Sequence, residues 1–115
     1  MALETGSVIG IRSLGGVVSN AVQGRQSLSY GGWADTAILP VLSSNPRRIS
    51  ALIQFWSDPL NTSTLLTVLL GDQAVCQLVQ GGSFQIDANY PWTGDVRVQA
   101  DVGTCYVVAN EVTIL

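Results

Sequence analysis

The strongest constraint on the fold is a strict alternation of apolar and polar side chains near the C-terminus. The stretch DVRVQADV, residues 95 to 102, alternates at every position. Successive side chains of a β-strand point to opposite faces of its sheet, so this period predicts a strand with one buried and one wet face. Wetting on one face is typical of antiparallel sheets. The predicted inward residues are Val96, Val98, Ala100 and Val102.

Short apolar runs separated by turn residues extend this pattern over most of the chain. LLTVLLG and AVCQLV, joined across GDQ, predict a hairpin that lies deep in a sandwich or against a partner, and CYVVANEVTIL predicts a last strand. RISALIQFW predicts a strand with Ile49, Ala51, Ile53 and Phe55 inward, and GGSFQIDA one with Phe84, Ile86 and Ala88 inward. We therefore expect an all-β fold, an antiparallel, jelly-roll-like β-sandwich of about seven or eight strands.

The first 45 residues are rich in glycine and serine. A helix is disfavoured there, because each interior glycine costs about 1 kcal/mol relative to alanine. We predict an extended arm or edge strand over residues 3–20 and the first core strand at Ala37–Leu42, which divides the chain into an arm of residues 1–24 and a sandwich domain of residues 25–115. An apolar arm that cannot solvate itself is expected to lie on a neighbouring subunit.

The composition points to a subunit of an assembly. A chain of 115 residues is long enough for one domain with its own core. Only 11% of its residues are charged, against about 25% in ordinary soluble domains. Much of the surface must therefore be uncharged, and we expect other subunits to cover part of it.

The residues needed for several common functions are missing. Histidine and lysine do not occur, which removes the usual general bases and the commonest metal ligand. Arg47 and Arg48 are the only adjacent basic pair in a chain of net charge −3, which argues against nucleic-acid binding. Aspartates such as Asp87 and Asp95 fit solvated turns, with a calcium site or a carboxylate pair as alternatives. We predict no enzyme activity, catalytic residue, metal or cofactor.

The two cysteines, Cys76 and Cys105, lie in apolar runs without metal-binding or redox spacing. Buried free thiols are predicted, and a disulfide between adjacent strands is the alternative. The N-terminus lacks the pattern of a signal peptide, and no apolar run reaches membrane-spanning length. We expect a soluble chain made in the cytosol, with no membrane partner.

An aromatic turn, DANYPWTGDV, precedes the alternating strand. Pro91 fixes φ and Gly94 is expected to supply a left-handed corner, which would fold the rings of Tyr90 and Trp92 over the end of the core. Alternatively, the rings anchor another subunit, since tyrosine and tryptophan are enriched at interface hot spots. A third interpretation is stacking on a carbohydrate.

The segment YPWTGDVRVQADVGTCYVVANEV, residues 90 to 112, resembles a hairpin pattern of small virion proteins of tailed bacteriophages. RRISALIQF and GGSFQI take the places of upstream strands in those proteins, so the resemblance covers about the last 70 residues. This chain departs from the pattern in two places: Trp92 replaces the usual tyrosine, and SDPLN follows Trp56 in place of an asparagine. The resemblance implies a structural role in a virion.

From the resemblance and the composition together, we expect a capsid decoration or cement protein located in the virion and assembled in the host cytoplasm. Its partners would be copies of itself, with a trimer favoured, and the major capsid protein or another virion protein. The alternatives are a tail, neck or fibre-base subunit and, from another class, a carbohydrate-binding module that uses Tyr90 and Trp92. The predicted interface residues are Val8, Ile9, Ile11, Leu14, Val17, Val18, Tyr90 and Trp92.

Overall fold

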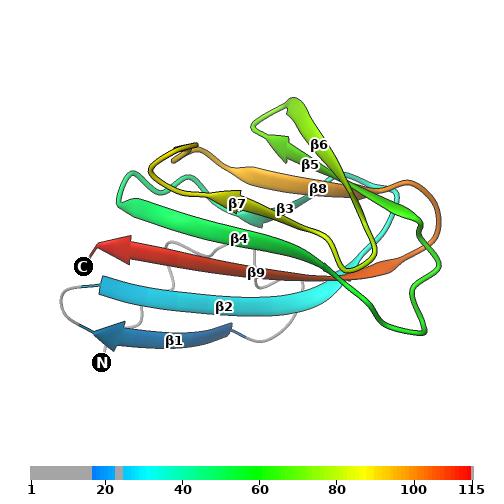
Figure 1. Cartoon of the computed structure of the whole chain (residues 1–115), viewed down its shortest axis with the longest axis horizontal. Helices are drawn as coiled ribbons and strands as arrows, with labels where there is room; N and C mark the ends of the chain where they lie inside the picture. Colours follow the sequence, from blue (N-terminus) through cyan, green and yellow to red (C-terminus); the bar gives the residue numbers. More distant parts are fainter. Residues whose placement is uncertain (1–16, 23–24, 115) are drawn as a thin grey trace.

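The computed structural model describes residues 17–22 and 25–114. These form nine β-strands in two antiparallel sheets that pack face to face (Figure 1). One sheet has five strands in the order β1-β2-β9-β4-β7, and the other has four in the order β3-β8-β5-β6. The strands are β1 (Val17–Val22), β2 (Arg25–Ala34), β3 (Leu39–Leu42), β4 (Arg48–Trp56), β5 (Leu65–Leu70), β6 (Gln73–Val79), β7 (Ser83–Ile86), β8 (Val96–Ala100) and β9 (Cys105–Ile114).

Strands β2 to β9 form a jelly roll. Strand β2 pairs with β9, β3 with β8, β4 with β7, and β5 with β6, so the chain is folded over as a set of nested antiparallel pairs. Strand β1 adds to the free side of β2 at the edge of the five-stranded sheet. The predicted antiparallel, jelly-roll-like sandwich is thus confirmed.

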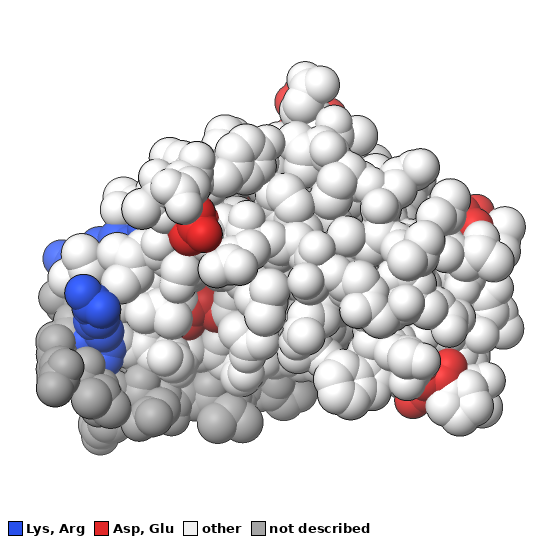
Figure 2. Space-filling view, viewed as in Figure 1, with Lys and Arg blue, Asp and Glu red and all other residues white. Residues whose placement is uncertain are grey.

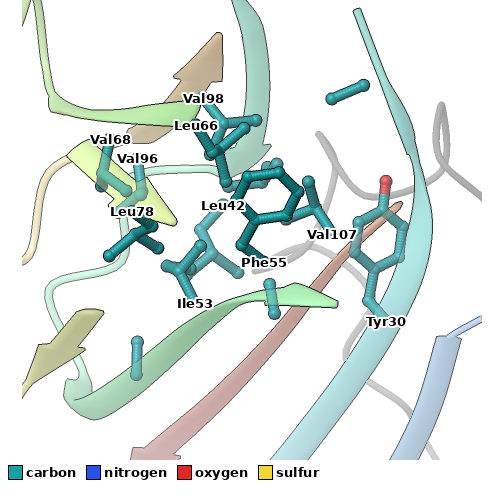
Figure 3. Packing of buried hydrophobic residues seen from close by; sticks show 14 of the residues in the cluster. Tyr30, Leu42, Ile53, Phe55, Leu66, Val68, Leu78, Val96, Val98 and Val107 are labelled. Atoms are coloured by element: carbon teal, nitrogen blue, oxygen red, sulfur yellow. The ribbon is translucent and has the colours of Figure 1, made fainter. Parts of the chain in front are cut away.

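The core lies between the two sheets, where side chains from both inner faces meet (Figure 3). Val96, Val98 and Ala100 are buried there, as their alternation predicts. Val102 is 53% exposed, so the prediction is wrong for this residue. The strand ends at Ala100, and the two-residue period does not extend into the turn that follows.

The inward face of β4 follows the prediction at Ala51, Ile53 and Phe55 but not at its first residue. The register with β9 shifts between Arg48 and Ser50, which marks a β-bulge. An extra residue in one strand resets the alternation. Arg48 is buried as a result, and Ile49 is only half-buried.

Strand β7 departs from the prediction in the same way as β8. Ile86 is buried and Phe84 is half-buried, but Ala88 is exposed. The strand ends at Ile86, so Ala88 belongs to the connection to β8. The inward assignment of Ala88 is therefore wrong.

The N-terminal half contains a long strand that the glycine-rich sequence concealed. Strand β2 buries Gln26, Leu28, Tyr30 and Ala34 in regular alternation. The expectation that the first core strand is Ala37–Leu42 is corrected: β2 precedes it, and β3 itself begins at Leu39. Of the predicted arm, residues 17–22 form β1, and residues 1–16 lie outside the described part of the chain.

The two cysteines are free thiols on different sheets, with Cys105 buried in β9 and Cys76 half-buried in β6. This agrees with the predicted free thiols, although only Cys105 is fully buried. Burial raises the pKa of both thiols. A raised pKa leaves little reactive thiolate at neutral pH.

Candidate functional site: two unlike ends of the sandwich

Successive connections alternate between the two ends of the strands (Figure 1). The connections β2–β3, β4–β5, β6–β7 and β8–β9 lie at one end, on the right of the figure. The connections β3–β4, β5–β6 and β7–β8 follow the opposite ends of their strands: β3–β4 and β7–β8 lie toward the left of the figure, where β2 starts and β9 ends, and the β5–β6 turn projects at its top. We call these the aspartate end and the arginine end, after the charged residues that they carry.

The charged residues divide unequally between the two ends. The aspartate end carries Asp35, Asp58 and Asp101 and, within the described residues, no basic side chain. Figure 2 shows this division on one face of the molecule: the blue of the arginines gathers at the left, and most of the surface is white. The arginine end carries Arg25, Arg47, Arg48 and Arg97 together with Asp72, Asp87, Asp95 and Glu111. Four charges of each sign balance there, so the net charge of the described residues belongs to the aspartate end.

Most of the exposed large apolar side chains also lie at the aspartate end. Leu60, on the β4–β5 connection, is 70% exposed, and Trp56, the last residue of β4, is 49% exposed. Clustered exposed apolar residues with polar surroundings mark interaction sites on soluble proteins. Among the described residues, the six exposed large apolar residues at this end are Trp33, Ile38, Trp56, Leu60, Val79 and Val102, whereas Tyr90 and Ile114 are the two at the other end.

Three aromatic side chains form a row across the outer face of the five-stranded sheet at this end. Tyr106 on β9 is paired with Trp33 on one side and with Trp56 on the other. The rings of Trp33 and Tyr106 meet edge to face, with centroids 5.3 Å apart. A Cβ added at Gly31 would lie 2.6 Å from the Tyr106 hydroxyl, so a larger residue there would displace the end of this ring. Sequence reasoning missed this row, because the three residues come from distant segments.

Side-chain hydrogen bonds hold the loops of the aspartate end in place. The Asp101 carboxylate accepts hydrogen bonds from the backbone N–H groups of Thr64 and Leu65 and from the Thr64 hydroxyl. These bonds, that of the hydroxyl first, lower the pKa of Asp101 to about 2. Asn61 accepts a bond from the backbone N–H of Tyr106 and donates one to the carbonyl of Trp56. Leu60 and Val102 therefore stand on fixed loops, whereas Trp33, Trp56 and Val79 belong to the ends of strands.

The arginine end is organised around a buried ion pair. The Arg48 Nε lies 2.6 Å from Glu111 Oε1, and both side chains are fully buried. The same guanidinium donates to the carbonyls of Trp92 at 3.1 Å, Gly94 at 2.8 Å and Ser43 at 2.7 Å. One side chain thus ties together β9, the β3–β4 connection and the β7–β8 connection.

The alternation of β9 is a sequence signal for this pair. In β9, Cys105, Val107 and Ala109 point inward, and the same alternation carries Glu111 into the core. A buried carboxylate requires a partner, most often an arginine. The bulge in β4 supplies that partner, and bulges are not visible in the alternation of a single strand.

Trp92 closes this end of the core. It packs against the core cluster and donates from Nε1 to the carbonyl of Asp95 at 2.9 Å. An added Cβ at Gly94 would lie 2.5 Å from the Trp92 ring, so a glycine is needed there for close packing. The expected left-handed corner at Gly94 is wrong, since the glycines with positive φ among the described residues are Gly71, Gly81 and Gly103.

Tyr90 differs from Trp92 in being half-exposed, with its ring edge to face against Phe84. A groove of about 380 Å³ opens beside Tyr90 and Trp92. Its walls come from the β5–β6 hairpin and from the aromatic turn between β7 and β8. They are Leu70, Gly71, Asp72, Gln73, Val75, Tyr90, Pro91 and Trp92.

The predicted interface residues do not form one cluster among the described residues. Val17 and Val18 belong to β1, at one edge of the five-stranded sheet, whereas Tyr90 and Trp92 follow β7 at the opposite edge. The predicted residues Val8, Ile9, Ile11 and Leu14 lie outside the described residues.

Residues 17–22 and 25–114 contain no group of three or more cysteine or carboxylate side chains placed to hold a metal ion. Among the same residues, no helix reaches the length and hydrophobicity that a membrane crossing requires.

No family model matches this sequence, and no curated protein matches it. A transcriptional regulator of the HTH_3 family from Vibrio cholerae has a similar structure, with a TM-score of 0.50 and 13% identity over 86% of this chain. This chain spans 50% of the length of that regulator. At this identity the likeness concerns the fold alone.

Two further solved structures show weaker likeness. One is a cupin-2 domain protein from Shewanella frigidimarina, with a TM-score of 0.45 and 9% identity over 84% of this chain and 79% of that one. The other belongs to the disulfide-linked pili of Bacillus endospore appendages, with a TM-score of 0.47 and 11% identity over 88% of this chain and 92% of that one. None of the three is described as a phage protein, so the resemblance to virion proteins stays a prediction.

Proposed function

We propose that this chain is a non-enzymatic structural subunit of a bacteriophage virion, in particular a decoration or cement protein of the capsid. The observation that carries the proposal is the aspartate end, where six large apolar side chains stand exposed on strand ends and hydrogen-bonded loops. Fixed apolar surface of this kind is suited to burial against another subunit. The resemblance of residues 90 to 112 to small virion proteins supports the assignment to a phage particle.

The outer face of the five-stranded sheet supports an assembly role as well. Beyond Arg25, the outward residues of β2, β9, β4 and β7 include no charged side chain. Charged residues are depleted in the buried part of protein interfaces. Neighbouring subunits could therefore pack along this face without leaving a charge unpaired.

The test is quantitative mass spectrometry of purified virions of the phage that encodes the chain. A decoration protein should be present in hundreds of copies, whereas a tail, neck or fibre-base ring of closed symmetry would contain about a dozen. Absence from the particle would overturn the proposal. A variant that lacks residues 1–16 keeps every described strand, so its failure to join the particle would assign a contact to the predicted arm.

Carbohydrate binding is the second candidate, because the groove beside Tyr90 and Trp92 offers aromatic walls. Tyr90→Ala is the informative variant, since Tyr90 is half-exposed while Trp92 also serves the core. Titration with host surface glycans should quench tryptophan fluorescence in the wild type and much less in Tyr90→Ala. Equal quenching in both proteins, or none in either, would count against this candidate.

A further inference from the structure

We propose that residues 12–16 extend β1 along the free edge of β2, so that the chain's own N-terminal segment covers one side of the aspartate end. Leu14 then lies beside Trp33. Arg12 lies beside Asp35. The inference deepens the proposed function, because it names the occupant of one side of the surface that we assign to a partner.

The direction of β1 brings the N-terminal segment to this end. The first residue of β1, Val17, lies opposite Tyr30, and the pairing runs back to Arg25 at the arginine end. The residues before Val17 therefore join the sheet from the side of the aspartate end, and Trp33 lies three residues beyond Tyr30 on β2. Sixteen residues precede Val17, whereas the extension needs only five.

Strand β2 has an open edge where the described part of β1 begins. Residues 31–34 pair with β9 on one side, and on the other side they have no partner among the described residues. An open edge presents unpaired backbone N–H and C=O groups, which an added stretch of strand satisfies. The segment before β1 is tethered at this edge, so its effective concentration there is high.

The register of β1 brings complementary residues together when it is continued. The described ladder between β1 and β2 contains no register shift. Continued by three residues it places Leu14 opposite Trp33, and continued by five it places Arg12 opposite Asp35. Apolar pairs and pairs of opposite charge stabilise antiparallel strands. A slip of two residues in either direction would lose both pairs.

Leu14 would extend the aromatic row on the outer face of the sheet. Trp33 ends the row on the side of β1 and is 42% exposed. The hydroxyl end of the Tyr106 ring lies close to Gly31, 2.6 Å from the position of an added Cβ. The residue opposite Gly31 in the continued register is Gly16, which leaves room for that hydroxyl.

Arg12 supplies a charge that the aspartate end lacks among the described residues. The exposed Asp35 carboxylate accepts a hydrogen bond from the Ala37 N–H at 2.8 Å through one oxygen, so its other oxygen can accept from a guanidinium. Arg12 is the one basic residue of residues 1–16. Glu4, the one acidic residue of that segment, is about 26 Å from Arg12 in an extended strand and does not compete with Asp35.

The extension also brings part of the predicted interface to the partner surface. Residues 1–11 would continue past β2 at the aspartate end, where Trp56 and Leu60 are exposed. Val8 and Ile9 would then join these side chains in one apolar surface. This step alone rests on the proposed function.

The chain contains no lysine, so a single introduced lysine makes a specific cross-linking test. Arg12→Lys keeps the positive charge and adds the one amine besides the N-terminus. A water-soluble carbodiimide joins an amine to a carboxylate in contact with it. In the full-length variant the new amine should link to Asp35 of the same chain several-fold more than to Asp58 or Asp101, as measured by peptide mass spectrometry of the monomer.

Two controls separate position from reactivity. Ile9→Lys, with Arg12 unchanged, moves the amine about 10 Å along an extended strand, and its link to Asp35 should be several-fold weaker. Asp35→Asn in the Arg12→Lys chain removes the carboxylate and keeps an oxygen for the Ala37 N–H, so it should abolish the link.

A further pair of variants tests the apolar contact. Leu14→Ser in the Arg12→Lys chain removes the side chain that would lie beside Trp33, and the yield of the link should fall several-fold. Leu3→Ser in the same chain makes the same change near the start of the segment and should leave the yield as it was. Equal yields in the two variants would overturn the placement of Leu14.

Three results would overturn the extension of β1: equal linkage to the three aspartates, a link that joins two chains and so makes a second copy the occupant, or no link to Asp35. Failure of the proposed function has a different outcome. A chain that gives the link within one molecule but is absent from purified virions would overturn the virion assignment and leave the extension standing.

Discussion

Different interactions hold the loops in place at the two ends of the sandwich. At the arginine end, charges are drawn into the core, where the fully buried Arg48 and Glu111 join three segments. At the aspartate end, exposed groups such as Asp101 and Asn61 bond to backbone N–H and carbonyl groups at the surface. The first arrangement serves the fold. The second fixes the loops and leaves apolar side chains exposed.

The largest expected effect comes from breaking the arrangement at the arginine end. Arg48→Met should lower the free energy of unfolding by about 3–5 kcal/mol, because it leaves the Glu111 carboxylate buried without its cation. Urea denaturation at neutral pH measures this loss. Arg47→Met is the matched control, since Arg47 is exposed, and it should change stability by about 0.5 kcal/mol or less.

A double variant separates the ion pair from the packing around it. Arg48→Met with Glu111→Leu removes both charges, and a buried pair can often be replaced by apolar residues at little cost. Its stability should lie well above that of Arg48→Met alone. A double variant as unstable as the single one would show that the backbone carbonyls bonded by Arg48, and not Glu111, account for the loss.

A smaller loss of stability is expected from the substitution of a glycine at the aspartate end. Gly103 has φ of 61°, and an added Cβ would lie 2.8 Å from Cβ of Thr62 and still closer to its hydroxyl oxygen. Gly103→Ala should cost about 2–3 kcal/mol, from left-handed strain of about 1–2 kcal/mol and a further steric term. Gly81→Ala isolates the strain, since φ is 84° there and an added Cβ would meet nothing within 4 Å. Equal losses in the two variants would contradict the steric contribution of Thr62.

The comparison of the ends also shows what the sequence could reveal. Alternation identified β4 and β8, because successive side chains of a strand point to opposite faces of its sheet, and an apolar run identified β9. It failed at Ala88 and Val102, which lie beyond strand ends, and at Arg48, where a bulge resets the period. Local patterns carry no information on where pairing stops.

The candidate site was harder to predict from the sequence than the strands were. The aromatic row joins Trp33, Trp56 and Tyr106 through strand register, which depends on the whole topology. Strand β2, which carries Trp33, was concealed by glycine and serine, residues that have a low strand propensity. The separation of charge between the ends likewise appears only once the jelly roll has placed alternate connections at opposite ends.

The surface hydrogen bonds to Asp101 at the aspartate end predict that the stability of the fold depends on pH. Hydrogen bonds from Thr64 and Leu65 hold the pKa of Asp101 at about 2, below its ordinary value of 3.8. A lowered pKa in the folded state stabilises the fold above pH 3.8, and this contribution is lost as the pH falls through about 2. Asp101→Asn should therefore lower the urea midpoint at pH 6 and have little effect near pH 2.

Thr64→Val serves as the control for this titration, because the Thr64 hydroxyl is the first cause of the shift. The variant should move the pKa of Asp101 back toward its ordinary value, which NMR titration of the carboxyl carbon measures directly. If Asp101→Asn lowered the midpoint equally at pH 6 and pH 2, the contribution would come from the geometry of the turn and not from the charge.

The smallest effect on stability is expected from a substitution on the exposed apolar surface of the aspartate end, which we propose contacts a partner. Trp56 is 49% exposed at the end of the aromatic row, so Trp56→Ser removes only part of the apolar area buried by a tryptophan in a core. The free energy of unfolding should fall by about 1 kcal/mol or less, while self-association measured by sedimentation should weaken several-fold. Phe55, its fully buried neighbour in β4, provides the contrast, since Phe55→Ala should cost about 3–5 kcal/mol. A loss at Trp56 as large as that at Phe55, with association unchanged, would mean that the aromatic row belongs to the fold and that the partner surface must be sought elsewhere.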